Sequence, residues 1–388
     1  MELLKTAADG GYINFASGLP DASLFPHDKV KLVTADILAE DWMDALQYGI
    51  AEGYPPLREL VAGRLTQRGL RATADNILIT HGSQQALDLA SRLYLDKGNT
   101  VLIERPTYLA AIQIFDSYEV SYASVPLDED GVDVDDWINK LKKLVREEVQ
   151  VFQFLLPNFQ NPTGITLSMD RRRKIAEAAA ELKVPLLEDD AYYDLRYEGE
   201  NLPPISVLAD NPLAMYTGTF SKTIAPGIRV GWIYGNKNTI SRMAQLKQIC
   251  DLHSGSLTQR IAFEFCKRGF IDLQIQFLRE VYKSKCNAML QALEREMPDG
   301  ISWTRPAGGM FLFLELPEEI DCELLLKRAM KEKLMFVPGR SFFPEDNLCR
   351  DEFVKLNSTN TLRLNFVSAE KKDIDRGISM LASLICEG

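Results

Sequence analysis

Residues 214–234 read AMYTGTFSKTIAPGIRVGWIY, in which two short apolar runs, 214–219 and 230–234, flank a polar turn. Runs of this length with aromatic and β-branched residues predict buried strands. The turn carries Lys222, just past the first run, and Arg229 seven residues later. A partly desolvated lysine at a strand end can lose its proton and act as an amine nucleophile toward a carbonyl. Taken alone, the pattern also fits an ordinary exposed lysine.

Five further apolar runs precede this stretch, and amphipathic helical segments alternate with the runs from about residue 76 to 235. The runs are 77–80, 101–104, 120–126, 151–156 and 184–188. This alternation is typical of βαβ units. We therefore expect an α/β fold with a mostly parallel, seven-stranded sheet and helices on both faces.

One predicted helix begins after Ser168, a plausible N-cap residue, and carries Asp170 in its first turn. Its apolar stripe predicts the buried face. The basic run 171–174 is interpreted as a solvated face of the same helix. The stripe consists of Ile175, Ala178, Ala179 and Leu182.

The pattern changes after about residue 241, first to helices and then, from residue 301, to strands and helices. The clearest of these strands are 311–316 and 362–366. We expect a smaller α+β domain here. The predicted division is 1–45 for an N-terminal arm and part of the small domain, 46–280 for the large domain and 281–388 for the small domain.

Composition narrows the function classes. The chain has 44 basic and 55 acidic residues, a net charge of −11, and no basic stripe, so nucleic acid is not an expected partner. No apolar segment is long enough to span a membrane and no secretory leader is evident, so we expect a cytoplasmic protein without membrane contact. Six cysteines without a C-x-x-C pair and three histidines without paired spacing predict neither disulfides nor a metal site.

Polar residues follow two other predicted strands at their carboxyl ends, where open parallel sheets bind ligands. His81-Gly82-Ser83-Gln84 delivers a helix N-terminus, which favours a phosphate but also fits plain N-capping by Ser83. Glu188-Asp189-Asp190 closes a buried strand. Buried acids need cations or donors, so at least one is expected to have a role, although capping of the next helix or exposure to water would also explain them.

The complete set of motifs occurs in a family order, and on these motifs the chain resembles fold-type I pyridoxal-5′-phosphate (PLP) enzymes of the class I and II aminotransferase group over nearly all its length. The motifs are Tyr48-Gly49, Gly53-Tyr54-Pro55-Pro56-Leu57-Arg58, Gly82-Ser83-Gln84-Gln85, Pro106-Thr107-Tyr108, Asn161-Pro162-Thr163-Gly164, Asp189-Asp190-Ala191-Tyr192, Thr219-Phe220-Ser221-Lys222 with Arg229, and Leu362-Arg363-Leu364.

The resemblance implies a role for each residue around the cofactor. Lys222 would hold PLP as a Schiff base and then move the substrate proton. Asp189 would keep the pyridine nitrogen protonated, and Tyr108 would stack on the ring. Asn161 and Tyr192 would donate to the phenolic oxygen. The phosphate would be held by Ser83, Gln84, Thr219, Ser221 and Arg229.

The resemblance also implies how substrates and a second subunit would be bound. Arg363 would take the substrate carboxylate in a bidentate fork, with Asn161 beside it. The segment around Gly18 resembles an arm that closes over the substrate. Tyr48 would reach the neighbouring subunit's phosphate, so a homodimer with shared active sites is expected.

Within the group, Ser17-Gly18-Leu19-Pro20, residues 158–162 and residues 307–311 look most like 2-aminoadipate and kynurenine aminotransferases. This likeness implies a 2-aminoadipate, aromatic or branched-chain α-amino acid as donor and a 2-oxo acid, 2-oxoglutarate, as acceptor. Another PLP reaction on the same fold, such as that of a decarboxylase, lyase or racemase, stays open because fold does not fix chemistry.

Two further alternatives are weaker. The group includes the aminotransferase-like part of MocR-type regulators, but the chain begins at the arm without a basic winged-helix domain, which disfavours an amino-acid sensor. No G-x-G-x-x-G motif opens a βα unit and no G-x-x-x-x-G-K-[ST] motif occurs, which excludes an ordinary dehydrogenase or NTPase.

Overall fold

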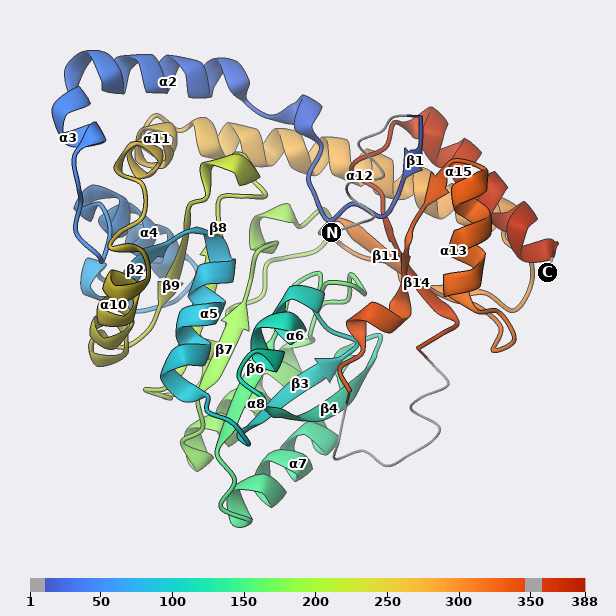
Figure 1. The fold of residues 1–388 in the computed structure, drawn as a ribbon, viewed down its shortest axis with the longest axis horizontal. Helices are drawn as coiled ribbons and strands as arrows, with labels where there is room; N and C mark the ends of the chain where they lie inside the picture. The colour runs from blue at the N-terminus through green and yellow to red at the C-terminus, as the bar shows by residue number, and fades with distance from the viewer. Residues whose placement is uncertain (1–10, 346–357, 388) are drawn as a thin grey trace.

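The computed structural model describes residues 11–345 and 358–387 (Figure 1). The described residues form an eight-stranded sheet, a four-stranded sheet and a two-stranded sheet, surrounded by helices. The α/β prediction is confirmed.

The large sheet has the strand order β2-β9-β8-β7-β6-β3-β4-β5. The strands from β8 to β4 run parallel to their neighbours, whereas β9 and β5 pair antiparallel. The prediction of seven strands was wrong by one: β5 has only two residues, too few to give a periodic pattern. The strands are β2 (Ile77–Thr80), β3 (Thr100–Arg105), β4 (Ser121–Asp128), β5 (Gly131–Val132), β6 (Val151–Leu155), β7 (Leu186–Asp189), β8 (Ala214–Thr219) and β9 (Gly231–Tyr234).

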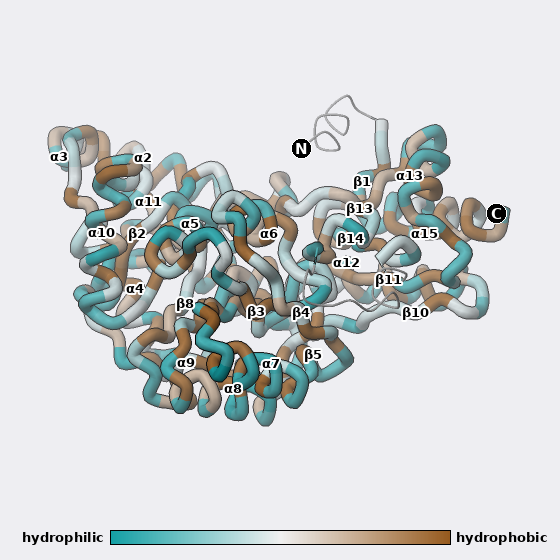
Figure 2. Tube along the Cα trace, turned by 60° about the horizontal axis from the view of Figure 1, so that its bottom comes forward, coloured by the Kyte–Doolittle hydropathy of each residue, from teal (hydrophilic) through white to brown (hydrophobic). Residues whose placement is uncertain are grey.

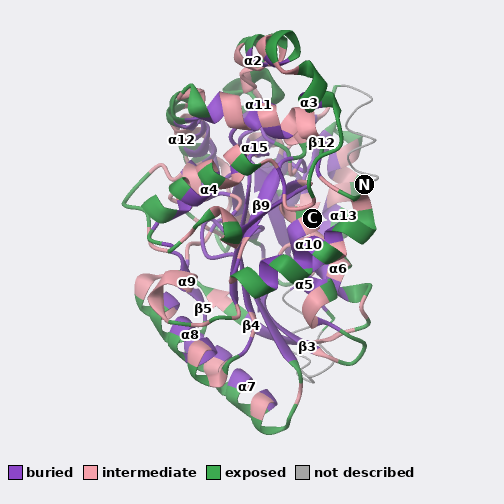
Figure 3. Ribbon diagram, turned by 90° about the vertical axis from the view of Figure 1, so that its left-hand side faces the viewer, coloured by how far each residue is buried: buried purple, intermediate pink, exposed green. Residues whose placement is uncertain are grey.

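Helices cover both faces of this sheet, because successive side chains of a strand point to opposite faces. In β2, Leu78 packs with α5 (Gly82–Tyr94), α6 (Leu109–Asp116) and α10 (Lys237–Asp251). Its neighbours Ile77 and Ile79 instead pack with α4 (Pro55–Gln67) and α11 (Ser256–Lys267). Figure 3 shows the buried strands between more exposed helices.

Helix α8 (Met169–Leu182) packs with α7 (Val134–Arg146) against the face that α4 and α11 share. Ser168 occupies the predicted N-cap position, although its side chain makes no capping hydrogen bond. Both helices alternate hydrophilic and hydrophobic residues (Figure 2). The interpretation of the basic run as wholly solvated was wrong: Arg172 is fully buried. Its guanidinium donates to the carbonyl oxygens of Leu167 and Pro157 and to Asn158 Oδ1, which satisfies its donors inside the protein.

The four-stranded sheet has the order β10-β11-β14-β13 and is formed by strands from the last quarter of the chain. It lies beside the large sheet (Figure 1). The predicted strands 311–316 and 362–366 correspond to its two central strands. The N-terminal strand β1 pairs with β12 in the two-stranded sheet. These strands are β1 (Ile13–Asn14), β10 (Ser302–Trp303), β11 (Phe311–Glu315), β12 (Leu334–Met335), β13 (Val337–Pro338) and β14 (Thr361–Asn365).

The remaining α-helices lie at the periphery or connect the sheets. They are α2 (His27–Glu40), α3 (Trp42–Leu46), α9 (Ile205–Leu208), α12 (Phe270–Glu296), α13 (Cys322–Lys331) and α15 (Lys371–Cys386). In the part of the chain that the structure describes, no helix combines the length and the apolar character that crossing a membrane requires. Five of the six cysteines are described and are free, and Cys349 lies outside the described residues.

Candidate functional site

Lys222 lies three residues beyond β8, at the edge of the sheet where β2, β3, β6, β7 and β8 all end. Its Nζ donates to the carbonyl oxygen of Gly18 at 3.2 Å. Burial, assisted by the charge of Arg363, lowers the pKa of Lys222 to about 8, although Asp189 opposes this shift. The amine therefore has a large neutral fraction at slightly alkaline pH and can act as a nucleophile.

The three acids at the end of β7 have different environments. Glu188 accepts hydrogen bonds from the backbone N–H groups of Ile205 and Ser206, at the start of α9, so one acid does serve as a cap. Asp189 is buried, and its Oδ1 has no hydrogen-bond partner among the described residues. Burial and the neighbouring Asp190 raise the pKa of Asp189 to about 7. A cation or an N–H donor is the partner that this carboxylate lacks.

Asp190 belongs to a separate buried network. Its Oδ2 accepts hydrogen bonds from Asn158 Nδ2 at 2.9 Å and from the Tyr216 hydroxyl at 2.8 Å. Arg68 donates to the same hydroxyl and pairs with Asp194. The Oδ2 atom of Asp190 is thus held by protein donors, while its Oδ1, like that of Asp189, has no partner among the described residues. Asp189 is the acid whose charge acts on Lys222, so we take it as the candidate for a ligand.

The N-terminus of α5 and the turn after β8 form a cradle for an anion. Arg229 Nη2 donates to the His81 carbonyl at 2.9 Å and lies directly against Gly82. A Cβ on Gly231 would lie 2.8 Å from Ser83 N, so only glycine permits this approach of β9 to α5. Free N–H groups at a helix start, next to a guanidinium, are suited to a phosphate.

Three other predicted phosphate ligands lie on the same two elements. Thr219 Oγ1 is 2.9 Å from Ser221 Oγ and accepts from Ser221 N at 3.1 Å. Both residues are buried. Gln84 occupies the third position of α5 and is exposed in the single chain. The cradle thus combines buried hydroxyls with one solvent-facing amide.

Arg363, on β14, is buried, and its charge acts on Lys222. Its Nη1 donates to Asn161 Oδ1 at 2.8 Å and its Nη2 to the Ala16 carbonyl at 3.0 Å. The guanidinium lies 4.3 Å from the ring centre of Phe311 and 5.0 Å from that of Phe342. Burial lowers its pKa to about 10, so it still carries its charge at neutral pH. A buried arginine between two aromatic rings is ready to receive a carboxylate.

Two tyrosines, Tyr108 and Tyr192, lie close enough to Asp189 and Arg363 to feel their charges. Burial raises the pKa of Tyr108 to about 12, with a contribution from Asp189 and opposing ones from Arg363 and Arg229. Burial also raises the pKa of Tyr192, whose ring centre lies 5.8 Å from Lys222 Nζ. Both phenols therefore stay protonated and can donate hydrogen bonds.

Tyr48 does not join this group within the single chain. Its side chain is 78% exposed and packs edge-on against His253, with ring centres 5.6 Å apart. It follows α3 at the end of the molecule far from the four-stranded sheet (Figure 1).

Two contributors were missed in the sequence. Asn365 Nδ2 donates to the carbonyl oxygens of Ser17 and Leu19, which fixes the turn at Gly18 above Lys222. The period of two in a strand places Asn365 on the same face as Arg363, so this residue could have been found. Phe342 lies on a short 3₁₀ turn remote in sequence, and no local pattern indicated it.

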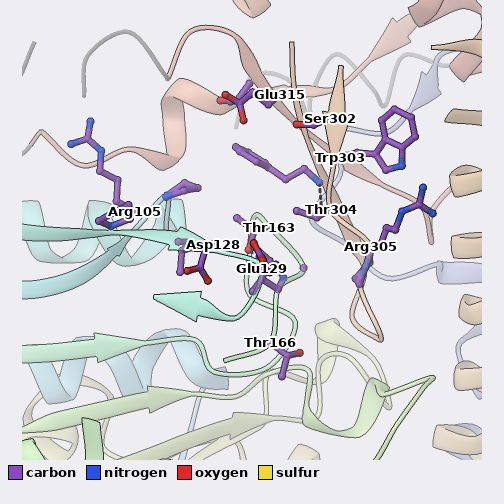
Figure 4. Close-up of a pocket in the computed structure, with 18 of the residues that line it drawn as sticks. Arg105, Asp128, Glu129, Thr163, Thr166, Ser302, Trp303, Thr304, Arg305 and Glu315 are labelled. Carbon is purple, nitrogen blue, oxygen red and sulfur yellow. Dashed lines mark hydrogen bonds between the residues drawn. The ribbon is translucent and has the colours of Figure 1, made fainter. Parts of the chain in front are cut away.

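A groove of about 960 Å³ lies between the end of β4 and the strands β10 and β11. Figure 4 shows Arg105 and Asp128 on one side and Trp303 and Arg305 on the other. None of the predicted site residues lines this groove, although Thr361 and Pro106 are each two residues from one of them. The chemistry is therefore expected at the residues around Lys222 and not in this groove.

These residues fit the PLP that the sequence resemblance implies. The unpartnered Asp189 Oδ1 matches a protonated ring nitrogen, the cradle matches a phosphate, and the amine of low pKa matches an aldehyde. Among the described residues no cluster of three or more His, Cys, Asp or Glu could hold a metal ion.

Comparison with known proteins gives full-length matches. The family model described as aminotransferase class I and II matches residues 11–381. The chain is 38% identical to aromatic-amino-acid aminotransferase 1 of Thermococcus litoralis, with 100% of this chain and 91% of that protein covered. It is also 38% identical to the 2-aminoadipate transaminase of Thermus thermophilus, with 98% and 91% covered.

A similar solved structure is that of kynurenine aminotransferase from Pyrococcus horikoshii, determined in complex with PMP, KYN as substrates and KYA as products. The two structures superpose with a TM-score of 0.93 at 40% sequence identity, covering 100% of this chain and 93% of the other.

Proposed function

The chain belongs to the class I and II aminotransferases and is a PLP-dependent transaminase; on this premise we propose that its donor is a 2-aminoadipate, aromatic or branched-chain α-amino acid and its acceptor is 2-oxoglutarate. The observation that carries the proposal is the position of Arg363. Its buried guanidinium lies against the rings of Phe311 and Phe342, and the segment 16–18 contacts both Arg363 and Lys222.

The substrate end of the cleft is proposed to bind an α-carboxylate. Arg363 can present two parallel N–H groups to it, and Asn161 orients the guanidinium. The rings of Phe311 and Phe342 supply an apolar, aromatic surrounding that suits a large side chain. The names of the relatives, which include aromatic and 2-aminoadipate enzymes, support this donor class.

Bound PLP supplies an electron sink that makes the substrate's α-proton removable. We propose that Asp189 keeps a proton on the ring nitrogen, that Asn161 and Tyr192 donate to the phenolic oxygen, and that Tyr108 covers the ring face. Lys222 would bind the aldehyde carbon and, once released by the incoming amine, move a proton between the substrate α-carbon and the cofactor. Its pKa of about 8 suits both roles, because the amine is neither fully protonated nor a strong base.

We propose that the phosphate is held by the cradle and that the arm closes the site. Ser83 and Gln84 would offer N–H groups at the start of α5, while Thr219, Ser221 and Arg229 would donate side-chain hydrogens. The Gly18 carbonyl already reaches Lys222, and closure of this segment over the substrate would exclude water.

A homodimer is proposed from the surface around Tyr48. Several large apolar side chains are exposed on α3, on the segment after it and at the end of α10, which is unusual for a free surface. Their burial by a second copy would bring Tyr48 to the partner's phosphate. This apolar surface consists of Trp42, Met43, Leu46, Tyr48, Ile50, Ile249 and Leu252.

The predicted domain division and location remain proposals. Pairing of β1 with β12 supports an N-terminal arm that belongs partly to the small domain. The proposed boundary at residue 280 lies within α12, so this helix would connect the two domains. Free cysteines throughout the described residues support the reducing environment of the cytoplasm.

The function can be tested by a half-reaction. Purified protein is loaded with PLP and mixed with single amino acids without any oxo acid, and the products are measured by mass spectrometry. We expect about one 2-oxo acid per subunit, released from the preferred donors, and no turnover until 2-oxoglutarate is added.

The matched variants are Lys222→Ala, which should abolish release, and Lys97→Ala, which removes an exposed lysine paired with Glu119 and should leave it unchanged. Release of carbon dioxide, ammonia or a D-amino acid would instead establish another PLP reaction. Binding without any product would establish a sensor.

A further inference from the structure

An ion pair between a buried lysine and a partly exposed aspartate lies behind the cradle, outside the set of residues assigned above. Lys247, on α10, is fully buried and donates to both carboxylate oxygens of Asp251 at 2.8 Å. Its Nζ also donates to Gln85 Oε1 at 2.9 Å. A buried ammonium is costly unless all its donors are used, and here all three have acceptors.

The same carboxylate is tied to the start of α5. Gln85 Nε2 donates to Asp251 Oδ2 at 2.5 Å, and His81 Nδ1 lies 2.8 Å from the same oxygen. The backbone N–H of His81 in turn donates to Gln85 Oε1 at 2.9 Å. His81 directly precedes Gly82, and its carbonyl accepts from Arg229. Asp251 therefore braces the backbone of the phosphate cradle from outside.

The chain makes a strained turn immediately after Asp251. Leu252 has φ 65° and ψ −58°, and His253 N donates to the Asp251 carbonyl at 2.7 Å. This is a γ-turn with positive φ, a rare conformation that side chains other than glycine adopt only under constraint. The constraint on one side is the pinned carboxylate of Asp251.

The far side of the turn supports the segment that carries Tyr48. The ring of His253 packs edge-on against Tyr48, and Ser256 Oγ donates to the Gln47 carbonyl at 2.9 Å. Ile50 and Leu252 line one small groove together. One turn thus joins the cradle of its own subunit to the exposed segment proposed to reach the partner.

We propose that Asp251 is a positioning residue that couples the phosphate cradle to the Tyr48 segment, so that cofactor binding in one subunit strengthens association with the other. The cluster that transmits this coupling consists of Lys247, Asp251, His81 and Gln85 together with the turn at Leu252. When PLP holds the start of α5 in place, the cluster holds the turn at Leu252 in place, and this turn then positions the backbone of the segment that carries Tyr48. Reciprocity requires that association equally strengthen PLP binding. The inference rests on the proposed homodimer and on the proposed role of Tyr48.

The test measures two equilibria in the full chain. The dissociation constant for subunits is obtained by sedimentation with and without PLP, and the ratio of the two constants is the coupling factor. We expect PLP to tighten the wild-type dimer, and Asp251→Asn to lower the coupling factor at least about fivefold. If Asp251→Asn does not fold, the double variant Lys247→Met/Asp251→Asn, which leaves no unpaired charge buried, supplies the measurement.

The control is Asp136→Asn, which breaks the pair that Lys140 forms with Asp136 at the same four-residue spacing on α7. It should keep the wild-type coupling factor within about twofold, because this partly exposed helical pair is remote in sequence from the cluster and contributes little energy. A coupling factor that survives in the cluster variants, or that falls equally in the control, would overturn the role of Asp251. A wild type that stays monomeric with PLP bound, or a Tyr48→Ala variant with unchanged PLP affinity, would instead overturn the proposed dimer and, with it, the coupling.

Discussion

The sharpest perturbation of the site is the exchange of one carboxylate for an amide at Asp189, compared with the same exchange at its neighbour Asp190. Both residues are buried, and they follow one another at the end of β7. Each has one buried oxygen, Oδ1, without a partner among the described residues, but Asp190 Oδ2 is held by Asn158 and Tyr216, whereas the charge of Asp189 acts on Lys222. Asp189→Asn removes the charge and keeps the shape.

The expected magnitude follows from the burial of this group. Breaking a buried ion pair by removing one partner costs about 3–5 kcal/mol. At about 1.36 kcal/mol per factor of ten, kcat/KM should fall by roughly 10² to 5 × 10³. Asp190→Asn should lower the free energy of unfolding by about 1–3 kcal/mol through its hydrogen bonds, yet change kcat/KM by less than about tenfold.

The assay is the steady-state rate with a preferred donor and 2-oxoglutarate at saturating PLP, accompanied by the PLP dissociation constant and by thermal unfolding of each variant. Because PLP is saturating, a lower rate reports a weaker electron sink and not a loss of bound cofactor. Asp189→Asn with more than a tenth of wild-type kcat/KM, or an equal fall in Asp190→Asn, would refute the assignment of the two acids.

Three further predictions concern the substrate, the cradle and the lysine. Arg363→Lys loses one of two hydrogen bonds to a carboxylate, about 1.5–3 kcal/mol, so kcat/KM for the amino acid should fall about 10- to 150-fold with PLP affinity unchanged. Gly231→Ala would place a Cβ 2.6 Å from a backbone carbon of the cradle and should raise the PLP dissociation constant about tenfold or more, whereas Gly227→Ala, with open space around it, should not. The rate at which cofactor-free protein captures PLP, measured by stopped-flow absorbance, should rise with pH through about 8. The reason is that the pKa of Lys222 is lowered to that value and only the neutral amine attacks. Asp189→Asn should shift the midpoint of this rise to lower pH, since the Asp189 carboxylate raises the pKa of Lys222.

The sequence alone was enough for the α/β architecture and the family. Apolar runs at strand length fixed seven of the eight strands of the large sheet, because a buried parallel strand needs nearly continuous apolar residues. The missing strand, Gly131–Val132, has two residues and gives no period. Polar residues placed directly after those runs also indicated where the candidate site would be, since parallel strands end at one edge.

The sequence could not predict which residues remote from one another in the chain would become hydrogen-bond partners after folding. The strand pattern does not separate Asp189 from Glu188 and Asp190, and only the motif order singled it out. Their environments differ because Glu188 accepts a hydrogen bond from Ser206 and Asp190 accepts one from Tyr216. The sequence pattern predicted a solvated Arg172, because it does not show the acceptors that fold around this side chain and allow it to be fully buried.

The cluster around Asp251 shows the same limit, because His81 and Asp251 are 170 residues apart and yet share a hydrogen bond. Periodicity and motif order report what each residue does for its own strand or helix. Long-range hydrogen bonds and burial decide pKa, charge and positioning, and these arise only when the chain has brought remote segments together.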